Sequence, residues 1–215
     1  MKQLQRQGSP SCLAHLIGGQ NSWNDVDRLE LWIAIDAMQN NLCAYCECHL
    51  GRKHIEHFRS QHDYSHLTFD WNNLFGSCGD SSRAGGWSRC GIYKDQYGRP
   101  YNPDNLIKPD VDNPSDFLRF LISGSVRPCN GLSPRDQLKA EETIRVFNLN
   151  NDVTLTNRRR QAIALQIEAI NALNELKEDV PPEDWDELLQ SQLEELQNTE
   201  FGTALAQAYR FNRQY

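Results

Sequence analysis

Four cysteines enclose a segment that carries the side chains of metal-assisted hydrolysis. Cys43 and Cys46 form a C-x-x-C pair, and Cys78 and Cys90 follow at wider spacing. Two thiolate pairs can share one tetrahedral zinc ion, so the pattern predicts a structural zinc site. The cysteine count of seven is odd, which excludes a fully paired disulfide framework and favours metal binding in a reducing compartment.

The segment between the two cysteine pairs reads His54-Ile55-Glu56-His57. Side chains alternate along a strand, so His54 and Glu56 would share one face, with His54 either a further metal ligand or a partner that orients Glu56. A carboxylate beside a histidine lets Glu56 bind a divalent cation. His57 would face the adjacent volume, where water and a phosphodiester meet.

The remaining sequence predicts helices around this segment. A capped helix is expected over residues 25–41 with Asp25 as N-cap, and another begins at Ser133-Pro134 and runs to Leu149. Residues 117–122 suit a short strand, and residues 76–91 and 100–114 suit loops. Apolar stripes predict one long helix from beyond residue 157 to 177, an acidic helix after Pro182, and a last helix over 201–211.

The net charge of −7 is concentrated near the C-terminal end, where the last 35 residues carry two basic and seven acidic side chains. The rest of the chain is close to neutral. It therefore lacks the broad positive field that gives strong non-specific binding to nucleic acid, and substrate affinity is expected to depend partly on a partner. No apolar stretch approaches the roughly 20 residues of a membrane span, and residues 1–13 lack the apolar core of a secretory signal, so a cytoplasmic location is expected.

Several motifs together resemble the HNH, or ββα-metal, nuclease family. Glu56-His57 matches its acid-histidine pair, and Asn73-Leu74 matches its middle element. More specifically, the chain is similar to the HNH subunits of Septu-type anti-phage systems, some of which are associated with retrons. That similarity covers residues 40–165 and includes the segments Ile55-Glu56-His57-Phe58-Arg59, Leu67-Thr68-Phe69-Asp70-Trp71-Asn72-Asn73-Leu74, Asn102-Pro103-Asp104 and Glu142-Thr143-Ile144-Arg145-Val146-Phe147-Asn148-Leu149-Asn150.

The resemblance implies a single-metal mechanism. His57 would take the proton from the attacking water, and a cation held by Glu56, Mg²⁺ or Mn²⁺, would stabilise the departing 3′-oxygen. Asn73 would hold the loop that orients His57. Arg59 and Lys94 are candidate phosphate contacts.

One position departs from the family pattern. Many members place Asp, Asn or His directly after the last cysteine as a cation ligand, whereas this chain has Gly91. Asp95 lies four residues later, one helical turn along, and is the candidate for the missing ligand. Without Asp95, Glu56 and water molecules would hold the cation, and the substrate phosphate would complete the site.

The resemblance also implies partners. The chain contains no G-x-x-x-x-G-K-[ST] phosphate loop, whereas Septu-type systems pair this nuclease with an ATPase subunit. We expect residues 180–215 to dock on that ATPase, and a retron reverse transcriptase with its DNA product is a further candidate partner. The substrate would be DNA or a structured RNA.

Three other readings compete with the nuclease. The four cysteines would suffice for a catalytically silent zinc module that binds nucleic acid or protein. A zinc deaminase needs H-x-E ahead of P-C-x-x-C, and here the cysteine pair comes first and lacks the proline. A zinc protease needs H-E-x-x-H, which is absent.

The sequence therefore predicts an α+β protein with a zinc-framed ββα-metal core and a helical C-terminal lobe. Its expected divisions are an N-terminal segment and helix over 1–41, the nuclease core over 42–110, a strand and helical lobe over 111–179, and acidic helices over 180–215.

Overall fold

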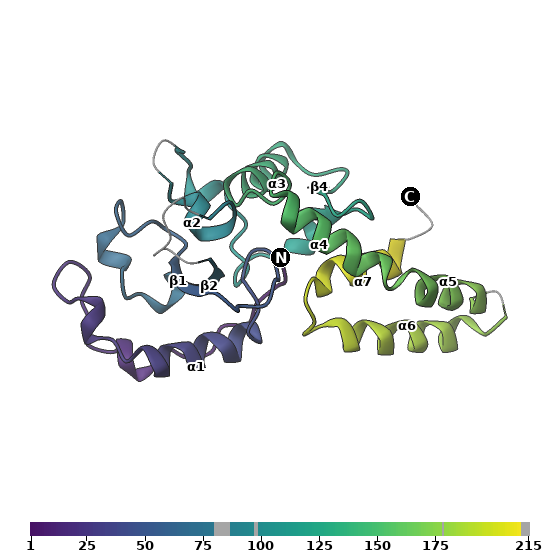
Figure 1. Cartoon of the computed structure of the whole chain (residues 1–215), viewed down its shortest axis with the longest axis horizontal. Coiled ribbons are helices and arrows are strands. Elements are labelled where there is room, and N and C mark those ends of the chain that lie inside the picture. Colours follow the sequence, from purple (N-terminus) through teal and green to yellow (C-terminus); the bar gives the residue numbers. More distant parts are fainter. Residues whose placement is uncertain (80–86, 97–98, 178, 212–215) are drawn as a thin grey trace.

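The computed structural model describes residues 1–79, 87–96, 99–177 and 179–211, and it has the expected α+β class. Two small two-stranded sheets lie in the first part of the chain, and only helices follow the last strand in the described residues (Figure 1). The strands are β1 (Lys53–His57), β2 (Leu74–Cys78), β3 (Leu118–Phe120) and β4 (Val126–Pro128). The α-helices are α1 (Arg28–Gln39), α2 (Cys90–Lys94), α3 (Pro134–Val146), α4 (Val153–Ala164), α5 (Ile167–Leu176), α6 (Pro182–Leu196) and α7 (Gly202–Phe211).

Strands β1 and β2 form an antiparallel pair that carries the predicted site. Glu56 lies opposite Phe75 and His57 opposite Leu74 in the register. All five residues of β2 are buried, because α1 packs on the sheet from one side and α2 contacts both strands. The chain order of this unit is therefore strand, strand, short helix.

Helix α1 begins later than the sequence predicted. Asp27 caps it by accepting from the backbone N–H groups of Leu29 and Glu30, whereas Asp25 belongs to a separate 3₁₀ turn that Ser22 caps. The helix ends at Gln39, and Asn40 follows in the left-handed conformation with φ of 52°. The prediction of a helix over 25–41 was therefore correct in kind and too long at both ends.

The expected loop over residues 76–91 is only partly a loop. Its first residues continue strand β2 to Cys78, and its last two begin helix α2. Residues 80–86 of this prediction lie outside the described part of the chain. Residues 100–114, by contrast, contain only 3₁₀ turns and irregular backbone, as expected.

The middle of the chain follows its capping signals. Ser133 caps α3 and Pro134 is its first residue, as predicted, although the helix ends at Val146 rather than Leu149. The predicted strand is β3, and it pairs with β4, which the sequence analysis missed. The turn between them needs a glycine, because Gly124 has φ of 83° and a Cβ there would overlap the Thr156 carbonyl oxygen.

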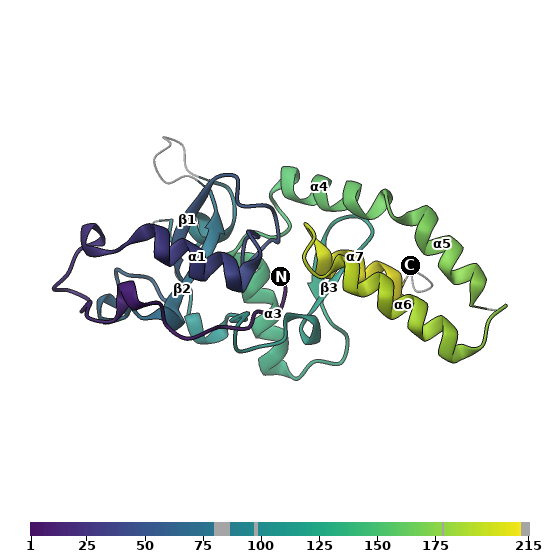
Figure 2. The same cartoon turned by 90° about the horizontal axis from the view of Figure 1, so that it is seen from below.

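The predicted long helix is two helices. Asp152 caps α4, which ends at Ala164, and α5 begins at Ile167. The acidic helix α6 returns beside α5, and Figure 2 shows this α5–α6 hairpin extending away from the rest of the protein. Helix α7 packs back against α4, α6 and β3 and buries Leu205 and Tyr209. Within the described residues, no helix combines the length and apolar character that crossing a bilayer requires.

Candidate active site

The four predicted zinc ligands meet in the structure. Cys43 and Cys46 lie in the turn after α1, Cys78 ends β2, and Cys90 begins α2. Their sulfur atoms are buried and all lie within 4.8 Å of one another, and the Sγ atoms of Cys46 and Cys78 are 3.6 Å apart. Zinc–sulfur bonds of about 2.3 Å in a tetrahedron separate the sulfurs by about 3.8 Å, so the cluster is placed to bind one structural zinc.

Backbone hydrogen bonds fix this cluster locally. The N–H of Cys43 donates to the Cys48 carbonyl at 2.8 Å, and the N–H of Cys90 donates to the Phe147 carbonyl at 2.9 Å. Cys90 has φ of 56°, an uncommon backbone conformation that this bond stabilises. The zinc site therefore ties α2, and the residues that follow it, to the β1–β2 pair.

Glu56 is buried beside the cluster and has two polar neighbours. Its Oε1 lies 3.0 Å from Nζ of Lys94, and its Oε2 lies 3.2 Å from Nε2 of His54. Burial would raise the pKa of Glu56, but the charge of Lys94 and the contact with His54 outweigh it and lower the pKa. Glu56 is therefore an ionised carboxylate inside the protein.

His57 follows Glu56 and is held by one nitrogen. Its Nε2 lies 3.0 Å from the carbonyl oxygen of Thr68. A carbonyl only accepts hydrogen bonds, so Nε2 carries the proton and Nδ1 keeps a free electron pair. Burial lowers the pKa of His57, so the ring is neutral near pH 7. The arrangement suits a general base.

The Asn73 side chain closes the loop that follows β1 through hydrogen bonds to the loop backbone. Its Nδ2 donates to the carbonyl oxygens of Arg59 and Leu67, at 3.0 and 3.2 Å, and its Oδ1 accepts from the Arg59 N–H at 2.8 Å. Only a carboxamide supplies donors and an acceptor in this way. The loop that it closes contains Thr68, the residue that holds His57.

The structure does not place Lys94 as a surface phosphate contact. The side chain is only 1% exposed, and its ammonium group donates to the His57 carbonyl and contacts Glu56, Asp95 and Tyr101. Burial opposes the charge, but the carboxylates of Glu56 and Asp95 raise the pKa of Lys94. Lys94 is thus an internal countercharge, because two carboxylates surround its amine.

Asp95 follows the last residue of α2 and shares this ammonium group with Glu56. Burial and the negative charge of Glu56 raise the pKa of Asp95 to about 6. Both expected cation ligands therefore turn toward Lys94. Arg59, the other candidate phosphate contact, is partly exposed and forms an ion pair with Asp104.

The absence of a side chain at Gly91 leaves room for the buried carboxylate of Glu56. A Cβ at position 91 would overlap the carboxylate of Glu56. The backbone N–H of Gly91 instead donates to Ser77 Oγ at 3.2 Å, with the Glu56 side chain packed on the bare Cα. The departure from the family pattern is therefore matched by the position of the glutamate.

Gly91→Ala is expected to displace the Glu56 carboxylate and to lower the cleavage activity that the resemblance implies at least about tenfold, because the buried ion pair with Lys94 must then break. Zinc content should stay at the parent level, since the four sulfurs are not touched. The control is Gly51→Ala, because a Cβ at Gly51 meets no atom within 4 Å. Parallel cleavage and zinc assays check this expectation. Unchanged activity in Gly91→Ala would contradict it.

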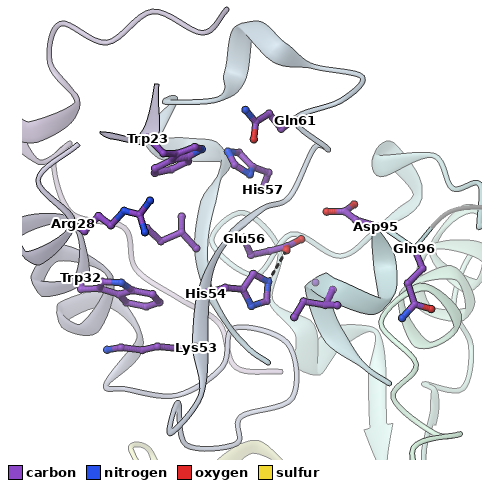
Figure 3. Close-up of a pocket in the computed structure, with 13 residues that line it drawn as sticks. Trp23, Arg28, Trp32, Lys53, His54, Glu56, His57, Gln61, Asp95 and Gln96 are labelled. Carbon is purple, nitrogen blue, oxygen red and sulfur yellow. Dashed lines mark hydrogen bonds and ion pairs between the residues drawn. The ribbon is translucent and has the colours of Figure 1, made fainter. Parts of the chain in front are cut away.

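His57 and Glu56 open onto one cavity of about 720 Å³ (Figure 3). Residues that the sequence analysis did not single out also line this cavity: Trp23, Arg28 and Trp32 on the α1 side, and Lys53 on β1. Trp23 lies edge-on to the His57 ring, with centroids 5.5 Å apart. Arg28 and Trp32 are four residues apart, so the sequence could have predicted that they share one face of a helix. It could not have predicted that this face would lie against β1.

The fit of a catalytic cation can be judged from the donor atoms. In the described residues, the four cysteines are the one group of three or more His, Cys, Asp or Glu ligands that gather closely enough for a metal ion. Two ligands side by side on a small octahedral cation, each at about 2.1 Å, lie about 3 Å apart. His54 Nε2 and Glu56 Oε2, at 3.2 Å, fit that spacing, and the Nδ1 atom of His54 is buried without a partner among the described residues.

Together these observations define an α+β protein with a cluster of four cysteines, placed to bind a metal ion, beside a buried glutamate and a buried histidine. No model of a known protein family matches the chain. The chain is similar to the Septu protein PtuB of Bacillus thuringiensis, with 28% identity over 191 residues. This covers 83% of the chain and 66% of the relative, so the chain spans just under two thirds of that protein. The predicted resemblance to Septu-type proteins is confirmed.

Proposed function

We propose that the chain is a metal-dependent HNH endonuclease that cleaves nucleic acid in anti-phage defence. The observation that carries the proposal is the state of His57, which is neutral, fixed through Nε2 and next to the ionised Glu56 on a shared cavity. The printed name of the relative, a Septu protein, supports the defence role.

In this mechanism Nδ1 of His57 accepts the proton of the attacking water, while the Thr68 carbonyl holds the ring. Asn73 keeps the loop closed, so that this carbonyl stays in place. Lys94 keeps Glu56 ionised. Glu56 and His54 would hold a Mg²⁺ or Mn²⁺ ion, with Asp95 as a further candidate ligand; such an ion supplies charge stabilisation for the departing 3′-oxygen.

A plasmid-nicking assay separates this function from a catalytically silent zinc module. The purified chain, alone and with its ATPase, is incubated with Mg²⁺ or Mn²⁺ and with a chelator that leaves the zinc bound. We expect cleavage only with added cation and only with His57 present. Absence of cleavage in both the parent and His57→Ala, or equal cleavage in both, would favour the silent module.

The pH dependence of cleavage should report His57. The base must be neutral to accept a proton, so the rate should rise with pH as His57 loses its proton and then level off. Because burial lowers the pKa of His57, the midpoint should lie below its ordinary value of 6.5. Initial rates between pH 5 and 8 measure it. A midpoint above about 7 would be inconsistent with this assignment.

The α5–α6 hairpin is the proposed docking site for an ATPase subunit. The expected docking region was residues 180–215. Because α7 packs against α4, α6 and β3, we restrict the proposed docking region to α6 and the adjoining α5. There Leu176 and Leu188 are 44% and 45% exposed, and each directly follows an exposed glutamate in the sequence, Glu175 and Glu187. The ATPase and a retron reverse transcriptase with its DNA product are implied by the resemblance alone.

Reversing the charges of Glu183, Asp184 and Glu187 to lysine should weaken co-purification with the ATPase about tenfold or more, since like charges across an interface repel. Glu141→Lys, on the exposed side of α3, is the control and should bind as the parent does. Pull-down from cells that express both proteins measures this. Full retention of the ATPase by the reversed variant would count against docking through α6.

A further inference from the structure

One side of the cavity that His57 lines has the composition of a nucleotide-binding surface. Trp23 comes from the turn before α1, Arg28 and Trp32 from α1, and Lys53 from the start of β1 (Figure 3). The Nζ of Lys53 lies 4.2 Å from the centroid of the Trp32 ring. Indole rings provide faces for bases, and the cationic groups provide contacts for phosphates.

Two of these side chains, Arg28 and Trp32, have surface that a ligand can reach, whereas the Nζ of Lys53 lies 3.4 Å from a carboxylate oxygen of Asp36. Arg28 is exposed and makes no hydrogen bond or ion pair with any described residue. Trp32 is partly exposed: part of its surface packs against the core, and part lines the cavity. The cavity volume of about 720 Å³ lies within the range of roughly 300–1,000 Å³ that is typical of ligand pockets.

The charge of the protein favours one kind of nucleic acid. A chain with net charge −7 gains little from the phosphates of a duplex, because counterion release needs many basic contacts. An indole can add binding energy only where a base is unstacked and free to meet it, as in single strands, loops and flipped nucleotides. Stacking would therefore supply affinity that electrostatics does not.

We propose that Trp32 stacks on an unpaired base of the substrate while Arg28 binds its phosphate backbone, so that the site selects unpaired nucleotides. This inference rests on the proposed function, because it places the bound strand beside His57. Trp23 packs against both His57 and Phe69, so its replacement would disturb the base. Among the described residues, Trp32 makes no ring contact with His57 or Phe69, so it is the position to test.

The test measures binding without cleavage. In full-length protein carrying His57→Ala, the Kd for a labelled DNA or RNA strand is measured by fluorescence anisotropy, single-stranded and annealed into a duplex. We expect tighter binding of the single strand. Adding Trp32→Ala should weaken that binding by about 5-fold to 150-fold and leave duplex binding unchanged. Trp32→Phe keeps a stacking face and should retain most of the affinity.

Arg28→Ala should lower the salt dependence of single-strand binding by about 0.7 in the slope of log K against log salt. Arg135→Ala, an exposed arginine of α3, is the matched control and should leave the slope unchanged.

The inference is overturned if single strand and duplex bind equally, if neither binds, or if Trp32→Ala leaves the single-strand Kd unchanged. Its failure is distinct from failure of the nuclease. If cleavage requires His57 but single-strand binding does not depend on Trp32, only the stacking proposal is refuted. Protein that binds single strands through Trp32 but never cleaves would refute the nuclease alone.

Discussion

Replacing His57 by alanine is expected to lower the rate of nucleic-acid cleavage by a factor of about 10² to 10⁴, the usual contribution of a general base. Burial lowers the pKa of His57 and its Nε2 is bound to the Thr68 carbonyl, so Nδ1 is the atom proposed to accept the proton of water. The alanine variant lacks this proton acceptor. Glu56 cannot take over the role, because its carboxylate is paired with Lys94 and His54. Single-turnover cleavage of a labelled substrate measures the loss.

His62→Ala is the matched control for that variant. His62 lies in the loop that follows β1, its side chain is 94% exposed, and it contacts only the neighbouring Asp63 among the described residues. We expect parent activity in this variant and parent zinc content in both. If both histidine variants cleaved at the parent rate, His57 would not be the base.

Replacing Cys43 by serine is expected to abolish zinc binding and to unfold the region around the site. A structural zinc contributes about 10–16 kcal/mol of apparent binding free energy in small zinc domains, which equals or exceeds the whole stability of a typical domain. Here the cluster joins the turn after α1 to β2 and α2, so its loss releases the elements that carry Glu56 and Lys94. Metal analysis should find one zinc per parent chain and almost none in the variant, with a lower Tm.

Cys129→Ser provides the control for the zinc prediction. Cys129 is outside the cluster, partly exposed, and its Sγ lies 3.7 Å from the Ser115 carbonyl. Zinc content and Tm should match those of the parent. Should Cys43→Ser not fold well enough to purify, zinc release from the parent on thiol modification gives the same information. A parent protein without zinc, or Cys43→Ser with full zinc and unchanged Tm, would refute the metal centre.

Much of the fold was predictable because its signals are local. The cysteine spacing predicted a cluster, and Ser133-Pro134 predicted the start of α3, since caps and ligand pairs act over a few residues. The break between α4 and α5 was not predictable, because no glycine or proline marks Leu165 and Gln166. The partner strand β4 was missed because three residues give too short a pattern.

The candidate site was predictable in its residues but not in its charges. His54, Glu56, His57 and Asn73 were found through motif and alternation. The burial of Lys94 between two carboxylates depends on how α2 packs against β1, which no local pattern encodes. The cavity wall formed by α1 was missed for the same reason, since helical spacing defines a face and tertiary packing decides what it meets.

The chemistry of the product ends tests the central claim most directly. In the proposed mechanism, water activated by His57 attacks phosphorus and expels the 3′-oxygen, so plasmid DNA or total RNA cleaved by the chain with the proposed ATPase partner should carry 5′-phosphate and 3′-hydroxyl ends. Formation of these ends should require Mg²⁺ or Mn²⁺ and disappear with His57→Ala. RNA ends with 2′,3′-cyclic phosphate, or the same ends produced by the His57→Ala protein, would contradict the account.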